Sequence, residues 1–190
     1  MLVDNQVLVL RSFITPEECS SLTAWAMESA DSQFVDGVSR NVGSTEFIKI
    51  KTRRTNRMAQ NILYPDLVYA IQARLRAEFP LIQDAEIIKH HGKDGVVVSI
   101  TYDTGDVYRH KDPAVDDQVP NTIALRFNLL VSKAESGGLI HVEDETYDLN
   151  PGDLMAYSVS ENYHSVDTCS GSNPRIMFMF GFCVPRGSQL

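Results

Sequence analysis

The order of structural patterns along the chain constrains its fold more than any single motif does. The first half carries two helical patterns, whereas from residue 95 onward the sequence breaks into short β-rich runs. Clusters of Gly, Pro, Asn, Asp and Ser separate these runs, as is typical of strands joined by turns. This order predicts an α+β domain: a double-layered β-sandwich or barrel of jelly-roll type, supported by N-terminal helices.

The N-terminal region gives clear boundaries for its elements. Residues 7–13 predict a strand, and Thr15, Pro16 and Glu18 then form a helix-start pattern with a capping box. Residues 66–79 have apolar side chains at helical spacing, and Pro80 ends that pattern. Residues 44–57 alternate well enough to predict a strand that runs into a basic loop.

Length and composition favour one globular domain. The 190 residues are 43% hydrophobic and 22% charged, without an internal repeat or a linker. We therefore predict a single domain over residues 1–190, in which residues 1–94 give helical support and cover the substrate, and residues 95–185 form the jelly-roll core. The net charge of −8 argues against nucleic acid as the main partner.

The termini and cysteines add a prediction of location. The N-terminal sequence has neither the pattern of a signal peptide nor that of a membrane span, so a cytoplasmic location without membrane contact is expected. Three widely separated cysteines, Cys19, Cys169 and Cys183, indicate neither a disulfide framework nor a zinc site. They are expected to be buried or partly buried thiols.

The sequence YRHKDP places His110 and Asp112 two positions apart near the end of a predicted strand. Side chains at this spacing project from the same face, so both could reach one metal ion. The pair alone is common, and a solvated strand end is the better explanation of it until a third ligand is found. His164 is the best candidate on another strand. Two histidines and one carboxylate on one side of an ion are typical of non-heme Fe(II) sites.

Arg175 opens the last apolar run, RIMFMFGFCV. An arginine in such a strand is costly to bury unless it meets an anion, and its planar fork suits a carboxylate. A surface salt bridge at the strand end is the alternative, and for this residue taken alone it is the better explanation.

Taken together, the order H-x-D, then His164, then Arg175 resembles the Fe(II)/2-oxoglutarate-dependent dioxygenases, and within them the prolyl 4-hydroxylase-like branch. YDTGDVYRHKD is similar to the branch pattern Y-x-x-G-x-x-Y-x-x-H-x-D, with one residue fewer before the histidine. SGGLIHV, NPGDLMAYS and the opening FITPEEC also resemble segments of that branch.

The resemblance implies a role for each matching residue. His110, Asp112 and His164 would bind Fe(II), Arg175 would bind the distal carboxylate of 2-oxoglutarate, and Tyr102 would hydrogen-bond it. The branch often has lysine at the position of Arg175. The implied reaction uses O₂ to hydroxylate an unactivated C–H bond of a small molecule, an amino acid or a peptidyl residue.

Other charged residues have weaker patterns. His90 and His91 are adjacent, so at most one of them could join a site, and a loop is the better explanation for the pair. His141 lies within a strand pattern and is not expected to bind the metal. Arg126 shares a face with Asn128 and could contact substrate, although an ordinary ion pair is about as probable. A basic cluster such as KIKTRRTNR usually forms a solvated surface. We predict that this cluster binds an anionic substrate through three arginines: Arg53, Arg54 and Arg57.

Two other functions stay open at this point. The first is a cupin-type metal-dependent dioxygenase that does not use 2-oxoglutarate, although a cupin would have H-x-H where this chain has His110-Lys111-Asp112. The second is a non-catalytic metal-binding module. The sequence does not distinguish a free from a peptidyl substrate, and it leaves the oligomeric state open.

Overall fold

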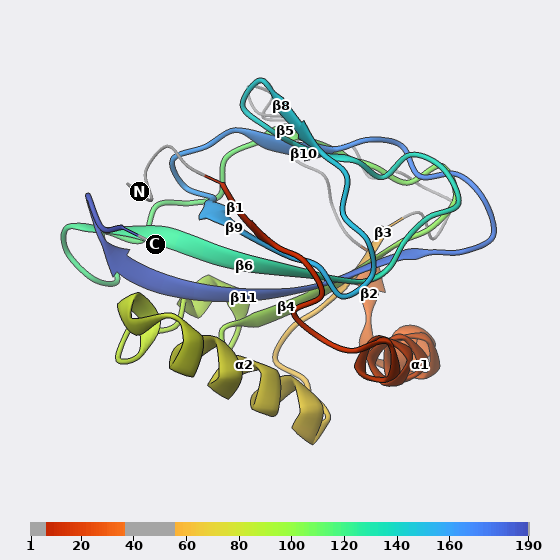
Figure 1. Ribbon diagram of the computed structural model, residues 1–190, viewed down its shortest axis with the longest axis horizontal. Coiled ribbons are helices and arrows are strands. Elements are labelled where there is room, and N and C mark those ends of the chain that lie inside the picture. Colours follow the sequence, from red (N-terminus) through yellow and green to blue (C-terminus); the bar gives the residue numbers. More distant parts are fainter. Residues whose placement is uncertain (1–6, 37–55, 190) are drawn as a thin grey trace.

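Antiparallel sheet dominates the computed structural model, which describes residues 7–36 and 56–189, and the sheet forms two layers (Figure 1). The larger sheet has seven strands in the order β1 (Leu8–Leu10), β9 (Leu154–Ser158), β6 (Thr122–Ser132), β11 (Arg175–Pro185), β4 (Val96–Thr101), β3 (Asn56–Ala59) and β2 (Val35–Asp36). The smaller sheet has four, in the order β5 (Val107–His110), β10 (His164–Val166), β7 (Ile140–Val142) and β8 (Glu145–Tyr147). The predicted β-rich second half is confirmed.

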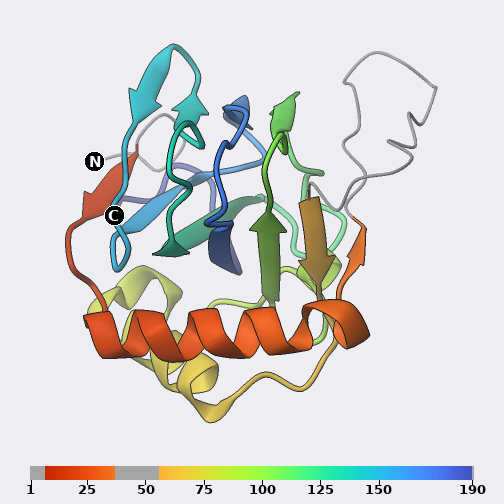
Figure 2. The ribbon, with the colours of Figure 1, turned by 90° about the vertical axis from the view of Figure 1, so that its right-hand side faces the viewer.

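Two α-helices, α1 (Pro16–Gln33) and α2 (Asp66–Glu78), lie on the side of the larger sheet that faces away from the smaller one (Figures 1 and 2). The predicted start of α1 is confirmed. Its N-cap Thr15 accepts a hydrogen bond from the Glu18 backbone N–H at 3.3 Å, and the Glu18 carboxylate accepts one from the Thr15 backbone N–H at 2.9 Å. This capping box satisfies two N–H groups that the helix itself leaves free.

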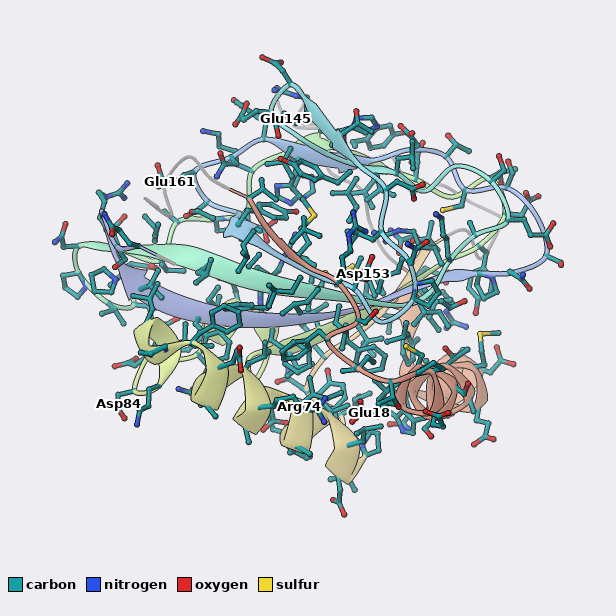
Figure 3. The ribbon with its side chains drawn as sticks, in the orientation of Figure 1. Glu18, Arg74, Asp84, Glu145, Asp153 and Glu161 are labelled. Carbon is teal, nitrogen blue, oxygen red and sulfur yellow. The ribbon has the colours of Figure 1, made fainter. Side chains whose placement is uncertain are left out.

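An ion pair joins the two helices. Arg74 of α2 points toward Glu18 of α1 (Figure 3), and its Nη2 lies 2.6 Å from Oε1 of Glu18. Because Glu18 also closes the capping box, one carboxylate holds both the start of α1 and its contact with α2.

The side chains of the larger sheet divide between two apolar layers. On β11, Phe178, Phe180 and Phe182 pack in the core beneath the helices, whereas Met177 and Met179 belong to the core between the two sheets. This alternation follows from the period of two along a strand. It leaves one face of the larger sheet for packing against the helices and directs the other toward the smaller sheet.

The N-terminal region also contributes strands, at both edges of the larger sheet. β1 pairs with β9 at one edge, and β2 and β3 extend the sheet beyond β4 at the other. The strand predicted for residues 44–57 lies mostly outside the described residues, and only its last part is seen, within β3. Short 3-10 helices, η2 (Pro80–Ile82) and η3 (Lys89–His91), lead from α2 into β4.

Two further expectations concern the thiols and the membrane. Cys19, Cys169 and Cys183 are buried free thiols, as predicted. Among the residues that the structure describes, no helix is both long enough and apolar enough to cross a membrane.

Candidate metal centre

The structure brings His110, Asp112 and His164 together between the two sheets. Asp112 Oδ1 lies 3.2 Å from Nε2 of His110 and 3.7 Å from Nε2 of His164. One potential ligand atom from each residue lies within 4.8 Å of the others. The sequence-predicted set is therefore a spatial cluster whose donors, two imidazole nitrogens and one carboxylate oxygen, suit a first-row divalent metal.

Strand pairing explains why these distant residues meet. β5 and β10 are antiparallel neighbours, and His110 lies directly opposite His164. Directly opposite residues share a face of the sheet. The chain leaves β5 after His110, and the backbone N–H of Asp112 then donates to the carbonyl of Val159 at 2.9 Å, which fixes the carboxylate beside the two rings.

Each histidine has its ring orientation set by a backbone carbonyl. Nδ1 of His110 lies 2.7 Å from the carbonyl oxygen of Tyr108, and Nδ1 of His164 lies 3.1 Å from that of Asn162. A carbonyl only accepts, so Nδ1 carries a hydrogen in both rings, and Nε2 is the atom that could give its lone pair to a metal. Both Nε2 atoms lie near Oδ1 of Asp112, which gathers the three possible donors around one point.

Arg126 on β6 lies against this cluster from the larger sheet. Its Nη1 donates to Oδ2 of Asp112 at 2.7 Å, and its Nη2 lies 3.1 Å from Nε2 of His164. The Nε–H donates to Asn128 at 3.0 Å, and Nη2 also contacts the hydroxyl of Tyr157 at 3.5 Å. Arg126 therefore forms the ion pair that the sequence left as one alternative, and its predicted contact with substrate stays a prediction.

The charges of the cluster are set by burial and by Arg126. Burial alone would raise the pKa of Asp112, but the Arg126 guanidinium and the neighbouring histidines hold it well below its usual range. Burial, with a contribution from Arg126, lowers the pKa of His164 to about 3. At neutral pH the site therefore offers an ionised carboxylate and a neutral His164, which are the protonation states that bind a metal.

Arg175 is a buried cation on the same face of the larger sheet. Arg175 is only 4% exposed, and its Nε donates a hydrogen bond to the carbonyl of Gly138 at 3.1 Å. In the described part of the chain it forms no ion pair with any carboxylate. Burial lowers its pKa, as expected for a cation without a counter-ion. The alternative of a surface salt bridge at the strand end is therefore wrong.

The remaining predicted site residues lie elsewhere. Tyr102 follows β4 and packs, half-buried, against the core beneath the helices, so its contact with the co-substrate stays a prediction. Arg57 is buried and forms ion pairs with Asp31 and Asp36, which tie β3 to the end of α1 and to β2. Its role toward substrate also stays a prediction. Arg53 and Arg54 lie outside the described residues.

Sequence reasoning did not expect His91 near the metal ligands. The ring is buried in η3, and its Nε2 lies 3.7 Å from Oδ2 of Asp112. With His90 and Asp112 it forms a second group of potential metal ligands. A Cβ at Gly181 would lie 2.2 Å from Nδ1 of His91, so only glycine leaves room for the ring. His141 instead hydrogen-bonds Asp167 at 2.6 Å, away from the cluster, as the sequence suggested.

The fold and the cluster define the class: a two-layered, mostly antiparallel β-protein with a His-Asp-His candidate metal centre between its sheets. Among the solved structures that are similar to this chain are three prolyl hydroxylases. They include the viral collagen prolyl hydroxylase of Paramecium bursaria Chlorella virus-1, determined as a 2OG complex (14% identity, 97% of this chain and 99% of that one, TM-score 0.66). They also include a prolyl-4-hydroxylase of Pseudomonas putida (14% identity, 95% of this chain and 93% of that one, TM-score 0.64).

A third similar structure is the Trichoplax adhaerens prolyl hydroxylase, in complex with a peptide fragment of the hypoxia inducible factor oxygen degradation domain. It is 12% identical, with 95% of this chain and 87% of that one covered and a TM-score of 0.57. No protein-family model matches the chain, and no curated protein matches it by sequence. At these identities the comparisons establish the fold.

Proposed function

We propose that this protein is an Fe(II)- and 2-oxoglutarate-dependent oxygenase that hydroxylates an unactivated C–H bond. The observation that carries the proposal is that a cluster of possible metal ligands and a buried cation lie on facing sheets. His110, Asp112 and His164 gather their donor atoms at one point, and Arg175 is a buried cation that pairs with no carboxylate of the described residues. We infer that the two sheets form the double-stranded β-helix, or jelly-roll, core that such enzymes share.

The residues fit iron and its co-substrate on chemical grounds. Two imidazoles and one carboxylate on one side of an ion leave open positions for further ligands. Arg175 supplies the positive charge that a dicarboxylate needs in an apolar interior, and its fork matches a carboxylate. With O₂, iron and 2-oxoglutarate supply the oxidising chemistry: 2-oxoglutarate becomes succinate and CO₂, and one oxygen atom enters the C–H bond.

The protein's own residues hold and enclose this chemistry. The carbonyls of Tyr108 and Asn162 orient the two histidine rings. Arg126 donates a hydrogen bond to Oδ2 of Asp112, which leaves Oδ1 beside His110. The apolar layer between the sheets, which includes Met155, keeps water from the interior. Within this proposal no side chain acts as a general acid or base, and residues contribute through positioning and charge.

A peptidyl residue is the substrate class that the comparisons favour. The Trichoplax adhaerens enzyme was determined with a peptide, and the other two similar structures are prolyl hydroxylases. A free amino acid or another small molecule remains the second candidate, because Arg126 places a buried cation next to the metal ligands and could bind a small acid.

The test is anaerobic loading with Fe(II) followed by addition of 2-oxoglutarate. The proposal expects a weak visible charge-transfer band from the iron and 2-oxoglutarate chelate, with wild-type intensity in His141→Ala and none in His164→Ala. Both variants remove one imidazole, but only His164 faces Asp112. Iron-loaded protein without the band would favour a cupin-type dioxygenase that does not use 2-oxoglutarate.

A further inference from the structure

The imidazole of His91 fills the place of a missing side chain on the larger sheet. Gly181 of β11 pairs directly with Arg126 of β6, and directly paired residues project from the same face of a sheet. A Cβ at Gly181 would lie 2.2 Å from Nδ1 of His91 and 2.7 Å from its Cε1. The ring therefore lies beside Arg126, on the face of the sheet from which Arg126 reaches Asp112.

Hydrogen bonds from two sides fix η3, which carries this ring. The backbone N–H of Ile88 donates to the carbonyl of Gly181 at 3.1 Å. Gln118, in the loop between β5 and β6, accepts from the backbone N–H of Lys89 at 2.9 Å and donates to the carbonyl of Ile87 at 2.6 Å. The imidazole is thereby held against both β11 and the loop that follows β5.

Only one atom of the His91 ring lies near a polar side chain. The residue is 3% exposed, and its Nε2 lies 3.7 Å from Oδ2 of Asp112. Nδ1 is buried and has no hydrogen-bond partner in the described part of the chain. An apolar side chain of similar size would fill the position without burying that nitrogen, so packing alone does not account for an imidazole. What the imidazole adds is one N–H donor near Oδ2.

The two oxygens of Asp112 have different neighbours. Oδ1 lies beside His110 and His164, whereas Oδ2 lies 2.7 Å from Nη1 of Arg126 and 3.7 Å from Nε2 of His91. A single hydrogen bond lets a carboxylate turn about its own bond, but two donors on one oxygen restrain that rotation. The separation of 3.7 Å is longer than a hydrogen bond, so a small turn of the carboxylate is needed to close it.

We propose that His91 is a positioning residue of the metal centre: its Nε2–H closes a hydrogen bond to Oδ2 of Asp112 when Oδ1 binds the metal. With Arg126 it then keeps the carboxylate bound through one oxygen. The inference rests on the proposed function for the presence of a metal. It explains why β11 has a glycine opposite Arg126, since any side chain there would exclude the ring.

The test measures Mn²⁺ affinity by calorimetric titration and coordination geometry by the visible absorption of Co²⁺-loaded protein. His91→Leu should weaken Mn²⁺ about 10-fold, the scale for losing a residue that orients a metal ligand. Its Co²⁺ bands should shift, because the carboxylate can turn and offer both oxygens. His91→Gln, whose amide N–H reaches a similar position, should restore the affinity and the bands.

Metal-free stability separates this role from packing. Metal-free His91→Leu should melt at or above the wild-type temperature, because it loses a buried nitrogen that has no partner within the described residues. His91→Asn is smaller and its amide ends short of Oδ2. It should match the Leu variant in affinity and in Co²⁺ bands, and it keeps the test valid if leucine does not fit beside Gly181.

His90→Leu is the matched control. It makes the same substitution at the neighbouring histidine of η3, which is exposed. This variant should bind one Mn²⁺ per chain with wild-type affinity and should give wild-type Co²⁺ bands.

Three outcomes would overturn the inference. Wild-type affinity and bands in His91→Leu would show that the ring does not orient Asp112. Weaker binding that His91→Gln does not restore, with a lower metal-free melting temperature, would show a packing role. Two ions per chain in wild type, and one in both His90→Leu and His91→Leu, would make the two histidines ligands of a second metal.

The proposed function fails in a different way. Wild type that binds no divalent ion would overturn the proposed function and this inference with it. Wild type that binds Mn²⁺ but not 2-oxoglutarate would overturn the proposed function alone, because the effect of His91 on the metal could still be measured.

Discussion

Arg126 holds one carboxylate oxygen of Asp112 and leaves the other free: Nη1 donates to Oδ2 at 2.7 Å, whereas Oδ1 faces the histidines. The two oxygens therefore have different partners before any metal arrives. Since Oδ2 is already paired, Asp112 is expected to bind a metal through Oδ1 alone. Four predictions follow from this pair and from the other buried or paired charges.

Asp112→Asn should abolish tight metal binding. The amide keeps the shape of the carboxylate but lacks its charge, and one of only three protein ligands is lost. We expect Mn²⁺ affinity to fall by about 100-fold or more, beyond the effect of losing a residue that only orients a ligand. Calorimetric titration measures this, with His141→Ala as the control that keeps its affinity. Full product formation by the Asn variant under normal turnover would remove Asp112 from the metal centre.

Arg126→Met should destabilise the metal-free protein and enlarge the stabilisation that a metal provides. Without the guanidinium, the Asp112 carboxylate is buried and unpaired, which costs about 3–5 kcal/mol. A divalent ion replaces the missing positive charge. The melting temperature should therefore rise more on adding Mn²⁺ in this variant than in wild type. An equal rise in both proteins would show that Arg126 does not compensate Asp112.

Arg175→Met should have the opposite effect on ligand-free stability. The variant removes a buried cation that has no carboxylate partner in residues 7–36 and 56–189, so the ligand-free protein should be at least as stable as wild type. Its affinity for 2-oxoglutarate should fall by about 2–4 kcal/mol, because the ligand loses its charged partner. Mn²⁺ affinity should stay unchanged. Wild-type affinity for 2-oxoglutarate in this variant would place the cation elsewhere, with Arg126 as the first alternative.

Glu18→Gln should lower stability at neutral pH and flatten its dependence on acid. The hydrogen bond from Arg74 lowers the pKa of Glu18 below its usual value of 4.5. A lowered folded-state pKa gives stability that is present above the unfolded-state pKa and is lost as the pH falls through the folded-state pKa. Chemical denaturation should show a loss of about 1 kcal/mol at pH 7 that shrinks below about pH 4.

Glu28→Gln is the matched control for that experiment. Glu28 is exposed on the same helix, outside the capping box and the ion pair with Arg74. Its substitution should leave the stability and its pH dependence as in wild type. If both variants behaved alike, the charge of the helix as a whole, and not the Glu18 contacts, would determine the acid sensitivity.

Local patterns predicted the elements and part of the site. The capping residues placed the start of α1, and the two-residue spacing of His110 and Asp112 placed both on one side of the chain. His164 was reached through its order in the chain and through family resemblance. Its position opposite His110 depends on strand pairing, which no local pattern encodes.

Other features depended on contacts between distant segments. The alternation of side chains along a strand correctly placed Arg126 and Asn128 on one face. It could not show that Asp112 would be the ion-pair partner of Arg126. His91 was set aside as part of a loop, and its position beside Asp112 depends on the 3-10 helix η3 and on a contact between distant segments.

The hydrogen bonds from Nδ1 of each histidine have a consequence for assembly. Each acceptor carbonyl belongs to the residue two positions before the histidine, at Tyr108 and at Asn162. Each imidazole is therefore oriented by its own short stretch of chain and needs no ion as a template. A zinc finger folds only around its metal, whereas this protein should reach its native state empty and exchange metal afterwards without unfolding.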